Sequence, residues 1–148
     1  QSLDLSENGV TNGALKRLST FLPNCRNLVA LSLSDNMIED GELFHLTSVL
    51  PYCPSLQRLD LDNNHISDSG MQIISDVICQ CVSLVHIDLS NNFMGSRGMG
   101  HLTRKLPFCS SLQVLDISCC PWVLSQDIQE LAAVSLPSLK IISSRNRE

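Results

Sequence analysis

The chain has 148 residues, of which 43% are hydrophobic but only 4% aromatic, so we expect one domain with an aliphatic core. With 15 acidic residues against 10 Lys and Arg and a net charge of −5, it lacks the basic stripe that binds phosphate, which argues against a nucleic-acid ligand. The chain contains no run of about 18 apolar residues, so no membrane span is expected.

The sequence repeats itself with a constant 28-residue period. The repeating positions are Leu3, Leu31, Leu59, Ile87 and Leu115, then Leu5, Leu33, Leu61, Leu89 and Ile117, and then Asn8, Asn36, Asn64 and Asn92, with Cys120 in the fifth unit. A period of this length is typical of a solenoid, in which each unit buries its apolar face against its neighbours. The repeat therefore predicts the architecture and favours binding through a surface over catalysis.

Each unit predicts a short strand, a turn and a helix. In the second unit, Leu31 and Leu33 alternate with small polar positions, as in a strand with one buried face. Asn36 then turns the chain, and its side-chain amide is suited to bond backbone groups that the loop leaves unpaired. Asp40 is placed to cap the following helix, which Pro51 ends. In chain order, helices are expected near residues 12–22, 40–50, 68–79, 96–106 and 126–134.

The two ends of the chain differ from the middle. The chain starts inside a unit, which we interpret as a fragment of a longer protein. At the other end, residues 119–148 form a degenerate terminal repeat, in which the leucine phase that includes Leu115 returns one residue early, at Ile142. Terminal units of solenoids are commonly atypical because their outer face meets water. Trp122 is expected to shield the edge of the core there.

Four of the seven cysteines, Cys25, Cys53, Cys81 and Cys109, follow the same period. Neighbouring coils would bring them within bridging distance, but a column of equivalent cysteines is better interpreted as buried thiols that pack like small apolar residues. Such thiols persist in a reducing compartment. The predicted location is therefore intracellular, in the cytoplasm, with the nucleus left open.

These units resemble leucine-rich repeats over nearly the whole chain, and the 28-residue unit with a full helix resembles the ribonuclease-inhibitor-like subclass. The resemblance implies an α/β fold: a horseshoe-shaped solenoid with parallel strands on the concave face and helices on the convex face. The predicted organisation is a single leucine-rich repeat domain over residues 1–148, with about five repeats.

The resemblance also implies that ligands bind at the outward positions of the strands. Carboxylates there would form an acidic ridge, in which neighbours repel by about 1 kcal/mol or less, so a cationic protein ligand would relieve the repulsion. The alternative is that Leu-Asp-Leu-Ser is simply a common sequence for this strand. The candidate concave-face residues are Asp4, Ser32, Arg58, Asp60, Asp62, His86, Asp88 and Asp116.

Three residues beside this ridge have two interpretations each. Arg58 and His86 are either polar anchors for a ligand or ion-pair partners of neighbouring acids. Phe93, which follows the turn asparagine of its unit, is either an exposed contact for a partner or a cover for the turn.

The sequence contains no motif for catalysis or metal binding. It has no Cys-x2-Cys pair, no His-Glu-x-x-His motif and no glycine-rich phosphate loop. Each cysteine is explained better by its repeat phase than as a nucleophile beside a histidine. No catalytic residue, metal or cofactor is therefore predicted, and the chain is not expected to be an enzyme.

The predicted function is a protein-interaction scaffold that binds a protein ligand, with a basic one favoured, and not nucleic acid or a membrane. Three alternatives stay open: the ligand-sensing repeats of a cytosolic immune receptor, a GTPase-activating leucine-rich repeat protein, and a structural spacer in a multidomain protein. The partner, the parent protein and the oligomeric state are not specified by the sequence.

Overall fold

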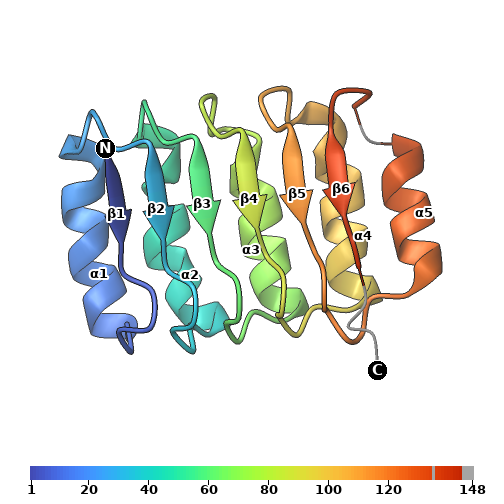
Figure 1. Ribbon diagram of the computed structural model, residues 1–148, viewed down its shortest axis with the longest axis horizontal. Coiled ribbons are helices and arrows are strands. Elements are labelled where there is room, and N and C mark those ends of the chain that lie inside the picture. The colour runs from blue at the N-terminus through green and yellow to red at the C-terminus, as the bar shows by residue number, and fades with distance from the viewer. Residues whose placement is uncertain (135, 145–148) are drawn as a thin grey trace.

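The computed structural model describes residues 1–134 and 136–144. Within these residues, six three-residue strands lie side by side in chain order and form one parallel sheet (Figure 1). The strands are β1 (Ser2–Asp4), β2 (Ala30–Ser32), β3 (Arg58–Asp60), β4 (His86–Asp88), β5 (Val114–Asp116) and β6 (Lys140–Ile142). Because each strand continues the sheet laid down by the one before, the predicted α/β solenoid is confirmed.

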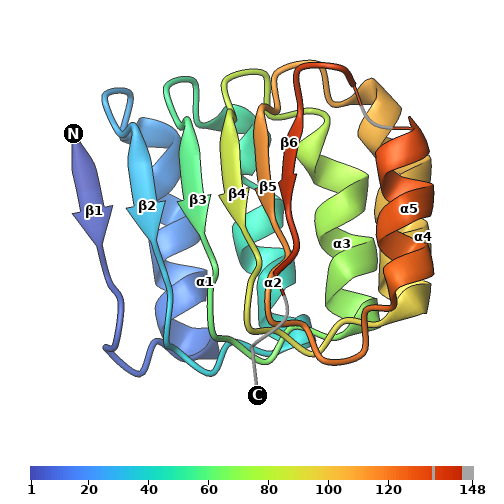
Figure 2. The same ribbon diagram turned by 45° about the vertical axis from the view of Figure 1, so that its right-hand side comes forward.

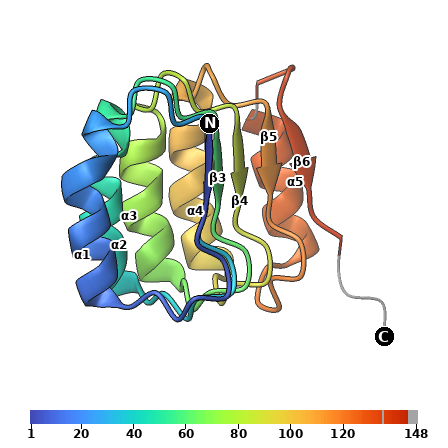
Figure 3. The same ribbon diagram turned by 60° about the vertical axis from the view of Figure 1, so that its left-hand side comes forward.

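The helices form a second layer, and all of them cover the same face of the sheet (Figures 2 and 3). They are α1 (Asn12–Phe21), α2 (Asp40–Thr47), α3 (Asp68–Ile78), α4 (Ser96–Lys105) and α5 (Ser125–Val134). Short 3-10 turns follow three of them, at Leu22–Asn24, Leu50–Tyr52 and Leu106–Phe108. Within the described residues, no helix covers the other face of the sheet (Figure 1).

The pairing of the strands follows the repeat. Leu3, Leu31, Leu59, Ile87 and Leu115 pair in that order, each with its equivalent in the next unit. The last step is shorter than expected, because Leu115 pairs with Ile141, and the predicted return at Ile142 is wrong. The terminal unit has therefore lost two residues relative to the others and not one.

The core runs as a ribbon between the sheet and the helices. The inward strand residues Leu31, Leu59, Ile87 and Leu115 are at most 1% exposed. Leu3 in β1 is only half-buried, because the side of β1 opposite β2 has no neighbouring coil in the described chain. Burial of these aliphatic side chains is the main driving force that stacks the coils.

A ladder of buried asparagines ties each coil to the one before it. Asn64 accepts hydrogen bonds at Oδ1 from the backbone N–H groups of Asn36 (3.3 Å) and Ile38 (2.9 Å). Its Nδ2 donates back to the carbonyl of Leu33 at 3.0 Å. The same exchange recurs at Asn36 and Asn92, which confirms the expected role of this phase. Side chains thus satisfy backbone groups that the turns leave unpaired.

The predicted cap of the second helix is wrong. Glu39 is the N-cap, and it forms a capping box with Glu42. Asp40 is instead the first helical residue, and its Oδ1 accepts the backbone N–H of Ser67 in the next coil at 2.8 Å. This helix is also shorter than expected, since it ends at Thr47 and the chain continues as a 3-10 turn that contains Pro51.

A second ladder therefore joins the starts of the helices. Asp68 occupies the same phase as Asp40, and its Oδ1 accepts the N–H groups of Gly95 (2.7 Å) and Gly98 (2.8 Å) in the following coil. A Cβ on Gly98 would lie 2.7 Å from this oxygen. Gly98 thus allows α3 and α4 to approach closely, so its role is in packing between the two helices.

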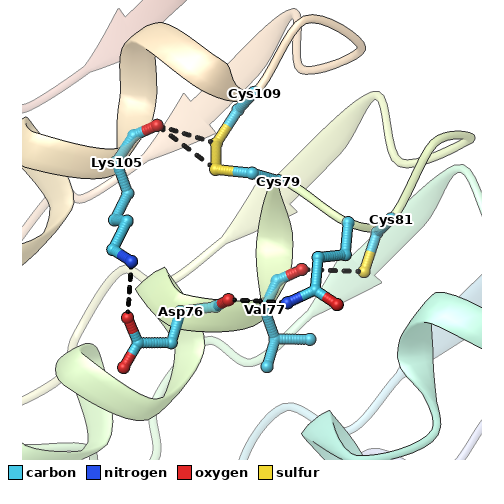
Figure 4. Close-up of a disulfide and its surroundings, with 7 residues drawn as sticks. Asp76, Val77, Cys79, Cys81, Lys105 and Cys109 are labelled. Atoms are coloured by element: carbon cyan, nitrogen blue, oxygen red, sulfur yellow. Dashed lines mark hydrogen bonds and ion pairs between the residues drawn. A yellow bond between two sulfur atoms is a disulfide. The ribbon is translucent and has the colours of Figure 1, made fainter.

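The cysteines only partly follow the predicted column of buried thiols. Cys53 and Cys81 are buried, and each thiol donates to the carbonyl four residues before it. Cys25 is exposed, and Cys109 forms a disulfide with Cys79, which joins the end of α3 to the next coil (Figure 4). The interpretation of Cys109 as a free thiol is wrong, because its nearest sulfur comes from the helix end and not from its own column.

Trp122 does not shield the core, contrary to the prediction. Its side chain is 64% exposed. Trp122 approaches the preceding coil at its Cβ, which would lie 3.1 Å from a Cβ added to Gly95. The backbones of Trp122 and Gly95 form a parallel β-bridge. Among the described residues, no helix is long and apolar enough to cross a membrane.

Candidate functional site

The proposed acidic ridge is a real column on the open face of the sheet. The register pairs Asp4 with Ser32, Ser32 with Asp60, Asp60 with Asp88, and Asp88 with Asp116. Three carboxylates, on β3, β4 and β5, are therefore immediate neighbours across strands that lie about 4.8 Å apart. Asp4 is separated from them by Ser32. We call Asp60, Asp88 and Asp116 the acidic ridge from here on.

Each aspartate of the ridge also has a local structural role. Its Oδ1 accepts the backbone N–H two residues further on: Asp62 for Asp60 (3.0 Å), Ser90 for Asp88 (2.9 Å) and Ser118 for Asp116 (2.9 Å). This bond fixes the carboxylate at the end of the strand. It accounts for an aspartate at this phase without any ligand, and it also holds the ridge in one orientation, ready for a partner.

Asp88, at the centre of the ridge, is electrostatically strained. Burial raises the pKa of its carboxyl, and repulsion from Asp116 and Asp60 raises that pKa further, against two hydrogen bonds from Ser90 that lower it. Asp4, at the edge of the sheet, is exposed, and hydrogen bonds from Ser6 lower its pKa. The ridge thus has at its centre a carboxyl whose charged form is disfavoured by burial and, to a smaller extent, by its acidic neighbours.

The raised pKa of Asp88 predicts that Asp88→Asn stabilises the folded protein and that this stabilisation depends on pH. Because the folded pKa lies above the unfolded value of 3.8, the contribution of Asp88 to stability is full below that value and is lost as the pH rises through the folded pKa. Asp88→Asn should therefore raise the free energy of unfolding at pH 7, and the gain should vanish below about pH 4. Urea unfolding of both proteins across this range measures it.

Asp4→Asn is the matched control. Its folded pKa is lowered, so its stabilisation is present above the unfolded value of 3.8 and is lost as the pH falls through the folded pKa. The substitution should lower stability at pH 7, with the opposite sign to Asp88→Asn. Equal effects of both substitutions would contradict strain at the centre of the ridge.

A hollow in the open face lies beside the ridge. It encloses about 230 Å³, and its lining includes Ser32, Arg58, Asp60, His86 and Asp88. Five of the eight candidate residues therefore share one concave site. Arg58 and His86 are direct neighbours in the register. Over residues 1–134 and 136–144, the one ion pair joins Lys105 to Asp76, so of the two interpretations of Arg58 and His86 the structure gives no ion pair with a neighbouring acid.

Two residues after each ridge position, the chain carries a second column of polar residues, which includes Asp62 and Ser90. These residues are more buried than their polar side chains indicate. Ser90 is 7% exposed, and its hydroxyl contacts Oδ1 of Asp62 (2.8 Å) and of Asp88 (2.5 Å). Asp62 also accepts from the Asn91 side chain at 2.7 Å. Asp62 is thus held within a polar network at the strand ends. It borders the acidic ridge and does not extend the ridge as a free carboxylate.

The structure adds a feature that sequence reasoning did not find. Where the strands end and the chain turns to the helices, four successive coils each expose one large side chain: Met37, His65, Phe93 and Trp122. The first three share one repeat phase, and Trp122 takes this place in the last coil, where it bridges to Gly95 as His65 bridges to Glu39. The rings of His65 and Phe93 lie 5.5 Å apart.

Of the two interpretations of Phe93, exposure is correct, since 50% of the residue is accessible. The signal that could have found Met37, His65 and Phe93 is their position directly after the turn asparagine of each unit, whereas Trp122 stands two residues after Cys120. That position becomes informative only once the exposure of the side chains is known.

Metal binding has no support in the described part of the chain, where no group of three or more His, Cys, Asp or Glu side chains could hold an ion. The thiols are also poorly suited to reaction. Burial, and to a lesser extent the neighbouring Cys53, raises the pKa of Cys81 to about 12, and burial raises the pKa of Cys120 to about 11. Such thiols stay protonated at neutral pH.

Comparison with known proteins agrees with this geometry. The family described as Leucine Rich repeat matches residues 24–41 and 52–75. The C-terminal domain of tropomodulin from Caenorhabditis elegans has a similar structure, with a TM-score of 0.76 and 16% identity over 90% of this chain and 81% of that domain. Residues 24–41 and 52–75 are thus leucine-rich repeats, and the described chain has the fold of a leucine-rich repeat solenoid. No curated protein matches its sequence.

A second solved structure is also similar to this one. It is the actin-binding site 2 of leiomodin-1, with a TM-score of 0.74 and 17% identity over 90% of this chain and 77% of that structure. At such identities the likeness establishes the shared fold and carries over no residue of a binding site. The site of this chain must therefore be argued from its own side chains.

Proposed function

We propose that this domain is a protein-interaction scaffold that binds a basic protein ligand on its open strand face, without catalysis. The observation that carries the proposal is the acidic ridge, where Asp60, Asp88 and Asp116 pair in register and the pKa of Asp88 is raised. A lysine or arginine placed between these carboxylates relieves their repulsion, so the binding energy includes a strain that exists before binding. The surface is rigid, so little ordering opposes association.

The remaining candidate residues fit this role in different degrees. Ser32, Arg58 and His86 line the hollow beside the ridge and supply hydrogen-bond donors for acidic or carbonyl groups of the ligand. Asp62 borders the ridge, and Asp4 lies at the far edge, behind Ser32. A ligand centred on β3 and β4 would therefore contact the hollow and the ridge together.

Leiomodin-1 provides a precedent for a protein ligand, since the similar structure is named as an actin-binding site. Our proposal takes from it the class of ligand and not its identity. We propose the ribonuclease-inhibitor-like subclass on the 28-residue units, and an intracellular location on the buried Cys53 and Cys81 thiols. The Cys79–Cys109 disulfide is the observation that favours an oxidising compartment instead. Within that setting, immune sensing, GTPase activation and a spacer role remain the alternatives.

Charge reversal of the ridge tests the proposal. A chain with Asp60→Lys, Asp88→Lys and Asp116→Lys should lose a basic protein that the unmodified chain retains from cytosolic extract, as read by mass spectrometry. The matched control reverses three acids on the helical layer, Glu42, Asp76 and Glu130, which gives the same net charge. Retention of the same proteins by both variants and by the unmodified chain would refute the ridge as the binding site.

A further inference from the structure

A row of exposed apolar and aromatic side chains borders the acidic face along the ends of the strands. Its members are Met37, His65, Phe93 and Trp122, which we call the strand-end row. Met37 is 66% exposed, Phe93 50% and Trp122 64%. These four side chains lie on consecutive coils, and the rings of His65 and Phe93 are 5.5 Å apart, whereas isolated exposed hydrophobics are common on any protein.

Backbone contacts hold the row in place. The N–H of His65 donates to the carbonyl of Ile38 at 2.9 Å, and the N–H of Phe93 donates to the carbonyl of Ile66 at 2.8 Å. Trp122 bridges to Gly95 in the coil before it. The loops that carry the row lie together at the lower edge of the sheet, beyond the tips of the strand arrows (Figure 1). The side chains are therefore presented from a fixed backbone, as a contact surface requires.

Met37 has a conformation that its own packing does not explain. Its φ is +53°, in the left-handed region that favours glycine. Gly9, the equivalent residue of the first coil, has a φ of +58°. A methionine here costs more conformational free energy than glycine, and its exposed side chain buries little in return within the chain. A partner that covers the Met37 side chain would offset that cost.

The surroundings of the row define the chemistry of its partner. Asp35 lies two residues before Met37, and Asp62 lies three residues before His65, so carboxylates flank the row on its strand side. A wholly apolar partner would bury these carboxylates without a counter-charge, which is costly although both accept hydrogen bonds within the chain. A wholly basic partner would leave the row in water. The acidic side also disfavours an anionic membrane surface.

We propose that the strand-end row and the acidic ridge form one composite site for a basic amphipathic helix of a partner protein. Its apolar face covers the row, and its lysines or arginines reach the ridge. The row crosses four coils, or roughly 15 Å at sheet spacing, which about ten residues of a helix span. This inference rests on the proposed function and adds the form of the ligand.

Trp122 is the one tryptophan of the chain, so its fluorescence reports directly on the row. The probe is a synthetic 14-residue amphipathic peptide of leucine and lysine, and its control has every leucine replaced by glutamine. We expect the leucine peptide to shift Trp122 emission to the blue on binding and the glutamine peptide to bind at least tenfold more weakly. Absence of a shift with the leucine peptide would overturn the composite site.

Two variants separate this inference from the proposed function. Met37→Ser with Phe93→Ser should weaken the leucine peptide at least tenfold and leave the glutamine peptide unchanged. Asp60→Asn, Asp88→Asn and Asp116→Asn together should weaken both peptides. If only the ridge variant weakens binding, the row is not part of the site and the proposed function stands. If only the row variant does, the ridge proposal fails, and the composite site fails with it.

A matched control comes from the opposite edge of the sheet. Phe108 is 72% exposed and lies in the 3-10 turn after α4, away from the ends of the strands. Phe108→Ser removes a similar exposed aromatic surface and should leave the affinity of the leucine peptide unchanged. Equal loss from Phe108→Ser and from the row variant would mean that the peptide adheres to exposed aromatics in general, which would overturn the inference.

Discussion

Asn92→Ala should lower the free energy of unfolding by about 4 kcal/mol, since several buried hydrogen-bonding groups lose their partner at once. Asn92 is fully buried. Its Nδ2 donates to the carbonyls of Leu61 (2.9 Å), Leu89 (3.1 Å) and Ser90 (3.0 Å), and its Oδ1 accepts the N–H of Ile66 at 3.0 Å. The groups left behind lie inside turns that water does not reach. Urea unfolding followed by circular dichroism measures the loss.

Asn8→Ala is the control at the same phase of the repeat. Asn8 is exposed, and its Nδ2 donates to the carbonyl of Ser6, within its own coil. Its loss should change stability by less than about 0.5 kcal/mol, as is usual for exposed positions. A loss at Asn8 as large as that at Asn92 would show that the residue type, and not the bonds between coils, sets the effect.

The repeat period made most of the fold predictable. Inward leucines, strands and turn asparagines recur at one spacing, and a solenoid offers only one way to bury them all. The register of Leu31, Leu59 and Ile87 therefore follows from their numbering alone. Where the period fails, the prediction fails too: the terminal coil pairs Ile141 and not Ile142 with Leu115, because that coil is two residues shorter than the others.

The errors concern side chains that reach between coils. Asp40 was predicted as a helix cap within its own unit, but its carboxylate bonds Ser67 in the next unit. Cys109 was predicted as a member of a thiol column, but it pairs with Cys79, which lies outside that column. In both cases the side chain can satisfy a pattern of its own repeat or make a contact with another coil. Spacing along the sequence does not tell which of these it makes.

The candidate site was predictable in outline and not in its energetics. The column of Asp60, Asp88 and Asp116 follows from the strand phase, and the structure confirms their adjacency. The raised pKa of Asp88 depends on burial by neighbouring coils, which the sequence does not contain. The strand-end row was missed because apolar residues in a turn are expected to cover the core, whereas Phe93 and Trp122 are exposed.

Breaking the Cys79–Cys109 disulfide should lower the free energy of unfolding by about 3 kcal/mol, because the bond closes a loop of roughly 30 residues in the unfolded chain. It joins the end of α3 to the coil that follows α4, and both sulfurs lie against the carbonyl of Lys105 (Figure 4). Cys79→Ser, and reduction of the unmodified protein, should produce the same loss in urea unfolding. Reductant should have no further effect on Cys79→Ser.

Cys25→Ser is the control for the loss of a cysteine outside this bond. Cys25 shares the phase of Cys109 but is an exposed thiol, so its replacement should leave both stability and the response to reductant unchanged. Alkylation of the denatured protein should label two fewer cysteines before reduction than after it. Equal labelling before and after reduction would contradict the bond.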